Sequence, residues 1–309
     1  MQPLLTTREP EPDGVSWCSP EWNDMRHAFW QLVRAPIRLR TSEGFFMRPS
    51  KIKAKLKRNE PVLVPAFVLV DPSLYELASL MGFDGIWIDL EHHLTSVETV
   101  GTLMRAARVG SADIMARCAK GEFMRLGRLL EAGAQGIMYP RCDNAQEAHE
   151  VVTWAKFAPM GRRGFDGGNP DAPYCSLPID RYVREANEQT FLAVQIEDPA
   201  ALEHVEAIAA VEGVDVVFLG SADFTVLSGI PGQFDHPSVQ EAIRRIAAAA
   251  RKAGKAWGMP SSSPERTRHL LDLGARFIAH GSDLIMVRDG LEAIRRGFGP
   301  LGFTFDGSL

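Results

Sequence analysis

Eight short apolar runs recur along the chain from about residue 62 onward, and a stretch with helical spacing follows each of them. Eight successive strand-and-helix units predict a closed (β/α)₈ barrel. The runs do not alternate strictly between apolar and polar residues, as expected of parallel strands that are covered on both faces. The expected fold class is therefore α/β, a TIM barrel, with an extra N-terminal helical extension. The runs are Val62–Val70, Gly85–Leu90, Asp113–Arg117, Gly136–Pro140, Phe191–Glu197, Val214–Gly220, Ala256–Met259 and Phe277–Gly281.

Several runs are followed by residues that commonly begin a helix. A capping or turn-forming residue stands before a proline, or a threonine and a glutamate form a possible capping box. An open doubly wound sheet is the alternative architecture, but no glycine-rich nucleotide motif follows any run. The helix-start signals are Asp71-Pro72, Thr95-x-x-Glu98, Asp198-Pro199, His236-Pro237 and Ser263-Pro264-Glu265.

Two regions depart from the eightfold repeat. Residues 1–50 precede the first strand as an N-terminal extension, and residues 20–33 have the apolar spacing of a helix. The barrel domain is expected to span residues 51–309. Within it, residues 158–177 form a loop rich in Gly, Pro and Arg that is too long to be a simple connection, and we expect it to act as a lid.

Composition excludes several kinds of partner. The formal net charge is −5, both signs are mixed along the chain, and no basic stripe suggests a nucleic-acid partner. The four cysteines are scattered, which argues against a disulfide framework or a thiolate zinc site. No signal peptide and no run of 18 apolar residues occurs, so we expect a cytoplasmic protein without a membrane partner.

Charged residues gather where the predicted strands end, which in such barrels is the face that carries the active site. Glu197 and Asp223 stand 223 − 197 = 26 positions apart, one strand-and-helix unit, so they should lie on neighbouring strand ends. Two carboxylates, with water and substrate completing the shell, suit Mg²⁺ or Mn²⁺. Arg117, at the end of a buried strand, would need these acids or an anionic substrate to balance its charge.

A second group of candidates follows the second strand. Asp89 stands three residues before His92 and could orient its ring, so this pair is the better candidate for proton transfer. His93 is interpreted as a turn residue.

At these residues the sequence resembles the HpcH/HpaI family of class II 2-keto-acid aldolases, over roughly residues 51–293. Six motifs in a shared order carry the resemblance. They are Gly82-Phe83-Asp84 with Asp89-x-Glu91-His92 and Arg117, Leu129–Ala134, Pro159-x-Gly161-x-Arg163-Gly164, Val194–Glu197, Val211–Asp215, and Gly220-x-Ala222-Asp223.

The resemblance implies roles for individual residues. Glu197 and Asp223 would bind a divalent metal, Mg²⁺, Mn²⁺ or Co²⁺. Arg117 would face the keto oxygen, and His92 with Asp89 would handle protons. Gln195 would line the site, and the backbone around Ser221, Ala222 and Asp223 would meet the substrate carboxylate.

The implied reaction is cleavage of a 4-hydroxy-2-oxo acid into pyruvate, or a substituted 2-oxo acid, and an aldehyde through a metal-stabilised enolate. The resemblance also implies a homo-oligomer, a hexamer or trimer, in which a final helix beginning near Asp283 packs on a neighbour. Departures from the family pattern at Ser221, Pro260 and residues 165–177 indicate an unusual substrate.

Two alternatives stay open. A related lyase or decarboxylase could act on a malyl- or citramalyl-type thioester, and Arg141, Arg162 and Arg163 could then meet coenzyme A. A non-catalytic binding barrel is the alternative from another class, but the joint presence of the acids, Arg117 and His92 speaks against it.

Overall fold

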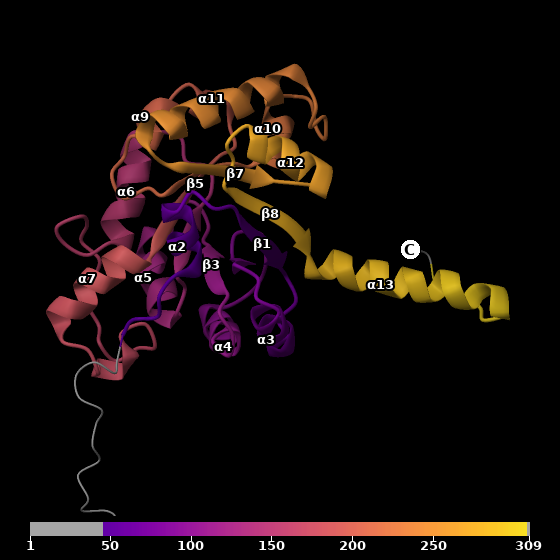
Figure 1. The fold of residues 1–309 in the computed structure, drawn as a ribbon, viewed down its shortest axis with the longest axis horizontal. Helices are drawn as coiled ribbons and strands as arrows, with labels where there is room; N and C mark the ends of the chain where they lie inside the picture. Colours follow the sequence, from indigo (N-terminus) through magenta and orange to yellow (C-terminus); the bar gives the residue numbers. More distant parts are fainter. Residues whose placement is uncertain (1–45, 308–309) are drawn as a thin grey trace, which may run out of the picture. The chain divides into compact units, whose positions relative to one another are not determined.

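The computed structural model describes residues 46–307. The predicted helix at 20–33, and with it most of the N-terminal extension, lies outside the described residues. Eight parallel strands close into a barrel in the order β1 to β8, which confirms the predicted fold class (Figure 1). The strands are β1 (Val62–Phe67), β2 (Gly85–Asp89), β3 (Asp113–Arg117), β4 (Gly136–Tyr139), β5 (Phe191–Ile196), β6 (Val216–Leu219), β7 (Ala256–Pro260) and β8 (Phe277–Ser282).

Helices alternate with the strands and surround the barrel. α2 precedes β1, and α13 follows β8. The helices are α2 (Lys51–Lys57), α3 (Pro72–Leu80), α4 (Val97–Ala107), α5 (Phe123–Ala132), α6 (Ala145–Ala155), α7 (Ile179–Gln189), α8 (Pro199–Leu202), α9 (Val205–Ala209), α10 (Ser221–Leu227), α11 (Pro237–Ala253), α12 (Pro264–Asp272) and α13 (Asp283–Phe298), with short 3₁₀ turns η1 (Pro173–Cys175) and η2 (Gly299–Leu301). None of the described helices is long and apolar enough to cross a membrane.

Most of the predicted helix starts are present as side-chain caps. Asp71 accepts a hydrogen bond from the amide of Ser73, and Asp198 and Ser263 cap α8 and α12 in the same way. The predicted box of Thr95 with Glu98 is wrong by one residue, because the Oγ of Ser96 accepts from the amide of Thr99 instead. A helix is capped by whichever hydroxyl the backbone directs toward the amides of its first turn. Thr95 and Ser96 both carry a hydroxyl, so the sequence alone does not show which of them caps α4.

The barrel interior is filled by large side chains that lie at alternate positions of the strands. Trp87, Met115, Phe191, Phe218 and Phe277 pack together there, and Ile52 of α2 closes the amino ends of the strands. Because interior positions recur every second residue, the residue two places after Trp87 also points inward, at the open carboxyl end. That residue is Asp89. The interior of the barrel therefore has a layer of polar side chains at its carboxyl end, the polar layer, next to the apolar side chains that fill the rest.

The loop of residues 158–177 does not lie over this open end, so the prediction of a lid is wrong. The loop connects the end of α6 to α7 and β5, and its Pro170 carbonyl accepts a hydrogen bond from Arg108, which precedes β3. The neighbouring Lys156 binds the carbonyl oxygen of Thr190, the residue before β5. A helix-to-strand connection must lie at the amino ends of parallel strands, on the face opposite the predicted site.

Candidate active site

Arg117 and Asp89 form the centre of the polar layer. They stand opposite each other in the register of β2 and β3. The guanidinium donates from Nε to one oxygen of Asp89 at 2.8 Å and from Nη2 to the other at 2.7 Å. Burial, the largest single influence, would raise the pKa of Asp89, but the hydrogen bonds and positive charge of Arg117, together with the amide of Glu91, outweigh it and lower the pKa. Asp89 is therefore a fixed anion that orients Arg117.

The remaining face of Arg117 points to groups that are less firmly held. Its Nη1 lies 3.2 Å from Glu91 Oε2 and 3.4 Å from Gln195 Oε1. The guanidinium also stacks over the indole of Trp87, 4.8 Å from the ring centroid. Glu91 Oε2 is buried without an aligned hydrogen-bond donor, although Arg117 is close enough for charge attraction. The polar layer thus contains acceptor capacity that the described residues do not use.

Glu197 is the most deeply buried of the predicted metal ligands, with 2% of its surface exposed. Its two oxygens accept from the amide of Arg141 at 2.9 Å and from Gln195 Nε2 at 3.0 Å. Burial and the negative charges of Asp223 and Glu91 raise the pKa of Glu197 to about 7. A cation bound beside Glu197 would offset the repulsion that these neighbouring negative charges exert on its carboxylate.

The backbone of the next strand leaves space for this carboxylate. Gly220 follows β6, and a Cβ at that position would lie 2.0 Å from Glu197 Oε1. α10 begins directly after Gly220, and Asp223 lies in the first turn of this helix. Within residues 46–307 no group of three or more Asp, Glu, His or Cys side chains is arranged to hold a metal ion. Glu197 and Asp223 can supply two carboxylate ligands, and Mg²⁺ and Mn²⁺ commonly take their other ligands from water and substrate.

The predicted pairing of His92 with Asp89 is wrong. His93 Nε2 lies 3.7 Å from Asp89 Oδ2, whereas His92 Nε2 lies 3.5 Å from Glu91 Oε2. The amide of Glu91 donates to Asp89 Oδ1, so the chain turns directly after β2 and neither strand nor helix spacing applies. The His92 side chain is 49% exposed and the His93 side chain 37% exposed.

Three residues at this end of the barrel were not predicted to be catalytic: Trp87, Glu91 and Arg141. Trp87 and Glu91 stand two places before and two places after Asp89. The period-two spacing of a strand could have identified Trp87, whereas Glu91 lies past the strand end and Arg141 follows a turn.

A cavity of about 330 Å³ opens beside the start of α10. It is bordered by Ser221, Ala222 and the end of β7, and it includes Pro260, the other residue that departs from the family pattern. Arg266 lines its far side and forms an ion pair with Asp235 at 2.9 Å. The predicted substrate-binding backbone therefore faces an open space of the size of a small organic acid.

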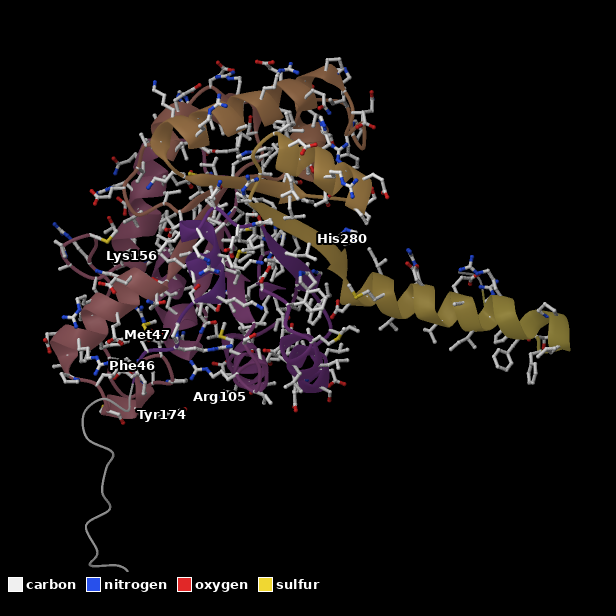
Figure 2. All side chains as sticks on the ribbon, viewed as in Figure 1. Phe46, Met47, Arg105, Lys156, Tyr174 and His280 are labelled. Atoms are coloured by element: carbon white, nitrogen blue, oxygen red, sulfur yellow. The ribbon has the colours of Figure 1, made fainter. Side chains whose placement is uncertain are left out.

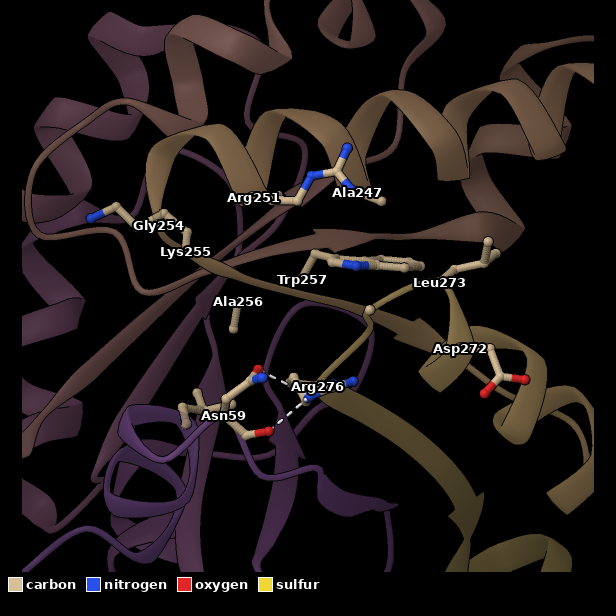
Figure 3. Close-up of a pocket in the computed structure, with 12 residues that line it drawn as sticks. Asn59, Ala247, Arg251, Gly254, Lys255, Ala256, Trp257, Asp272, Leu273 and Arg276 are labelled. Atoms are coloured by element: carbon tan, nitrogen blue, oxygen red, sulfur yellow. Dashed lines mark hydrogen bonds between the residues drawn. The ribbon is translucent and has the colours of Figure 1, made fainter.

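A larger cavity of about 480 Å³ lies at the opposite end of the barrel (Figure 3). Its wall includes the indole of Trp257, and Arg251, Lys255 and Arg276 line it. Arg276 is held there by the backbone and side-chain oxygens of Asn59. Because Ala256 and Arg276 stand at the amino ends of β7 and β8, this cavity is remote from the polar layer.

A barrel whose open end carries a buried glutamate, a second carboxylate and an arginine is typical of metal-assisted barrel enzymes. Residues 67–290 match the model of the family described as HpcH/HpaI aldolase/citrate lyase, and the chain belongs to this family. It is a carbon–carbon lyase of the aldolase type, which confirms the prediction.

Relatives and solved structures agree with this membership. The chain is 37% identical over 241 residues to a hydroxypyruvate/pyruvate aldolase of Delftia acidovorans, covering 78% of this chain and 89% of the relative. It is 34% identical to a 4-hydroxy-2-oxo-heptane-1,7-dioate aldolase of Shigella sonnei, covering 81% and 95%. The crystal structure of an HpcH/HpaI aldolase from Desulfitobacterium hafniense superposes with a TM-score of 0.75 at 26% identity, covering 82% of this chain and 97% of that one.

Proposed function

We propose that this chain cleaves a 4-hydroxy-2-oxo acid into pyruvate, or a substituted 2-oxo acid, and an aldehyde, with Glu197 and Asp223 holding Mg²⁺ or Mn²⁺. The observation that carries the proposal is the buried Glu197 carboxylate, whose pKa is raised to about 7 beside Asp223 and whose neighbour is the fixed guanidinium of Arg117. When bound, a divalent cation supplies a Lewis acid that withdraws electrons from the substrate carbonyl group.

The chain's own residues perform the remaining tasks. Arg117 presents Nη1 toward the keto oxygen and stabilises the negative charge that develops when the C3–C4 bond breaks. Asp89 keeps the guanidinium plane fixed, so this stabilisation needs no rearrangement during the reaction. Gln195 bridges Arg117 and Glu197 and holds both in place. The amides of Ala222 and Asp223 meet the substrate carboxylate at the start of α10.

His92 is the proposed acceptor of the proton from the 4-hydroxyl group. Its neighbour is Glu91, rather than Asp89, with Glu91 Oε2 3.5 Å from Nε2 of the ring. The ring is half exposed, so it can release the proton to solvent before the next turnover. His93, which lies near the already paired Asp89, is the matched comparison: His92→Asn should lower turnover much more than His93→Asn.

The thioester alternative loses support from the position of its basic residues. Arg163 is buried with Asp171 in the 158–177 loop, and Arg162 precedes it on the same loop at the amino ends of the strands. Of the three arginines expected to meet coenzyme A, only Arg141 lies at the open end of the barrel.

Assembly is a further part of the proposal. α13 leads away from the barrel, and beyond its first turns only the C-terminal segment of the described chain lies beside it (Figures 1 and 2). Apolar side chains along it are exposed, and such a helix favours burial against a second copy in a homo-oligomer. Leu291→Asp should then reduce the mass measured by light scattering. The exposed apolar side chains of this helix are Leu284, Ile285, Met286, Val287, Leu291, Ile294 and Phe298.

A direct assay tests the reaction. Pyruvate release is measured from a panel of 4-hydroxy-2-oxo acids after EDTA treatment and again after addition of Mg²⁺, Mn²⁺ or Co²⁺. We expect EDTA to abolish release and the metal ions to restore it. Full activity of metal-free protein, or trapping of a substrate imine on a lysine by borohydride, would contradict the proposal.

A further inference from the structure

Arg141 has a backbone conformation that side-chain-bearing residues seldom adopt. It lies two residues beyond the end of β4, with φ of +48°. A left-handed conformation is unfavourable for a residue with a Cβ and persists where surrounding contacts require it. Here the amide of Arg141 donates to Glu197 Oε2, and its carbonyl oxygen accepts from Lys120 Nζ. The strained residue is thus fixed on both sides of its Cα.

The guanidinium of Arg141 has no comparably close partner. Among the described residues its nearest charged neighbour is Glu91, with Nε 3.8 Å from Oε1, and 47% of the side chain is exposed. Arg117, by contrast, donates two hydrogen bonds shorter than 2.9 Å to a single carboxylate. Arg141 therefore retains most of its five N–H donors for another group.

The position of Arg141 indicates which part of a substrate it can reach. The buried groups Arg117 and Glu197 lie deepest, where the proposed reaction places the 2-oxo acid end of the substrate. Arg141 stands beside them on the solvent side. If the 2-oxo acid end binds at Arg117 and Glu197, as the proposed function has it, an aldehyde half that points toward solvent on this side of the mouth would come within reach of the half-exposed Arg141.

We propose that Arg141 is a specificity-determining residue that binds a carboxylate at the far end of the substrate, so that dicarboxylic 4-hydroxy-2-oxo acids are preferred over monocarboxylic ones. This inference rests on the proposed aldolase function. A guanidinium suits the task because its planar donors match both oxygens of a carboxylate, and a backbone fixed by Glu197 and Lys120 limits the freedom lost on binding.

Two substrates of equal chain length test the inference. Cleavage of 4-hydroxy-2-oxo-heptane-1,7-dioate breaks the C3–C4 bond, removes the hydroxyl proton and protonates C3, yielding pyruvate and 4-oxobutanoate. Cleavage of 4-hydroxy-2-oxo-heptanoate yields pyruvate and butanal by the same steps. We expect wild-type kcat/KM to be higher for the dioate by roughly 10- to 100-fold, the usual range for a hydrogen-bonded charge. Raising the ionic strength should reduce this ratio.

Three variants at position 141 distinguish the contribution of the guanidinium to substrate preference from general effects of a substitution. Arg141→Leu should bring the ratio of the two kcat/KM values close to one, and Arg141→Lys should leave an intermediate ratio. Arg141→Gly removes the side chain while accepting the left-handed backbone, so it should lose the ratio without losing thermal stability. Arg125→Leu is the matched control, because Arg125 carries the same charge on α5 but pairs with Glu122 at 3.1 Å. It should leave the ratio unchanged.

The outcomes distinguish this inference from the proposed function. If wild type releases pyruvate from both substrates but shows no preference, or if Arg141→Leu and Arg141→Gly keep the preference, Arg141 does not set specificity. If wild type releases pyruvate from neither substrate, nor from any member of the wider panel, the aldolase proposal itself fails.

Discussion

Buried acids lie at both ends of the barrel, but their surroundings differ. At the amino end, the Asp113 carboxylate accepts hydrogen bonds from Ser50 Oγ and from the amides of Lys51 and Ile52. At the carboxyl end, Glu91 Oε2 has no aligned donor, and Glu197 shares its surroundings with a second carboxylate. The acid at the amino end is bound by its own chain, whereas those at the mouth retain capacity for a ligand.

This difference distinguishes buried acids that stabilise the fold from buried acids that can bind a ligand. A buried polar group usually finds partners within the protein, and an incomplete set is uncommon enough to require an explanation. Substitutions at the amino end should therefore lower stability and leave turnover intact. Substitutions at the mouth should lower turnover and affect stability less.

Glu197→Gln should have the largest effect on activity. The substitution keeps the side-chain shape but removes one of the two anionic groups proposed to hold the cation, so turnover should fall roughly 10³-fold or more. The measurements are pyruvate release and binding of Mn²⁺ by calorimetry, with Asp223→Asn for comparison. Retention of both metal binding and turnover in Glu197→Gln would place the metal elsewhere.

Arg117→Lys should have the next largest effect on activity. An ammonium cannot donate to both oxygens of Asp89 and also face the keto oxygen, so turnover should fall by roughly 10²–10³. Circular dichroism checks that the variant is folded. Near-normal turnover in a folded Arg117→Lys protein would remove Arg117 from the reaction.

The same comparison shows what the sequence could predict. Eight apolar runs identified the strands, and the acids at the ends of β5 and β6 could be grouped because parallel strands end on one face. The position of a side chain after a strand end could not be predicted, because there the period of two no longer applies. For this reason His93, and not His92, lies near Asp89. The lid prediction was wrong because the length of a loop does not show at which end of the barrel the loop lies.

Asp113→Ala tests whether the buried acid at the amino end of the barrel contributes to stability and not to turnover. Removing the carboxylate leaves the hydroxyl of Ser50 and two backbone amides without their acceptor in a buried site. The free energy of unfolding should fall by about 1–3 kcal/mol, while turnover of the folded protein stays close to wild type. Chemical denaturation measures the first and pyruvate release the second. Asp113→Asn, which keeps one acceptor oxygen, should cost less, and an equal loss in both variants would argue against the hydrogen bonds as the cause.

Lys156 gives the smallest predicted effect, a change in how stability depends on pH. Its Nζ donates to the carbonyl oxygens of Asn187 and Thr190 and to Thr190 Oγ1. Burial, reinforced by the positive charge of Lys53, lowers the pKa of Lys156 to about 7. Between that pH and the ordinary lysine pKa of about 10.4, the unfolded chain holds a proton that the folded protein lacks, so this group's contribution to stability rises with pH across the window and is lowest below it. Lys156→Met has no such proton. Wild type should therefore gain stability relative to Lys156→Met as the pH rises from 7 to 9, as measured by urea denaturation in matched buffers, and a difference that stays constant over this range would show that Lys156 remains charged in the fold.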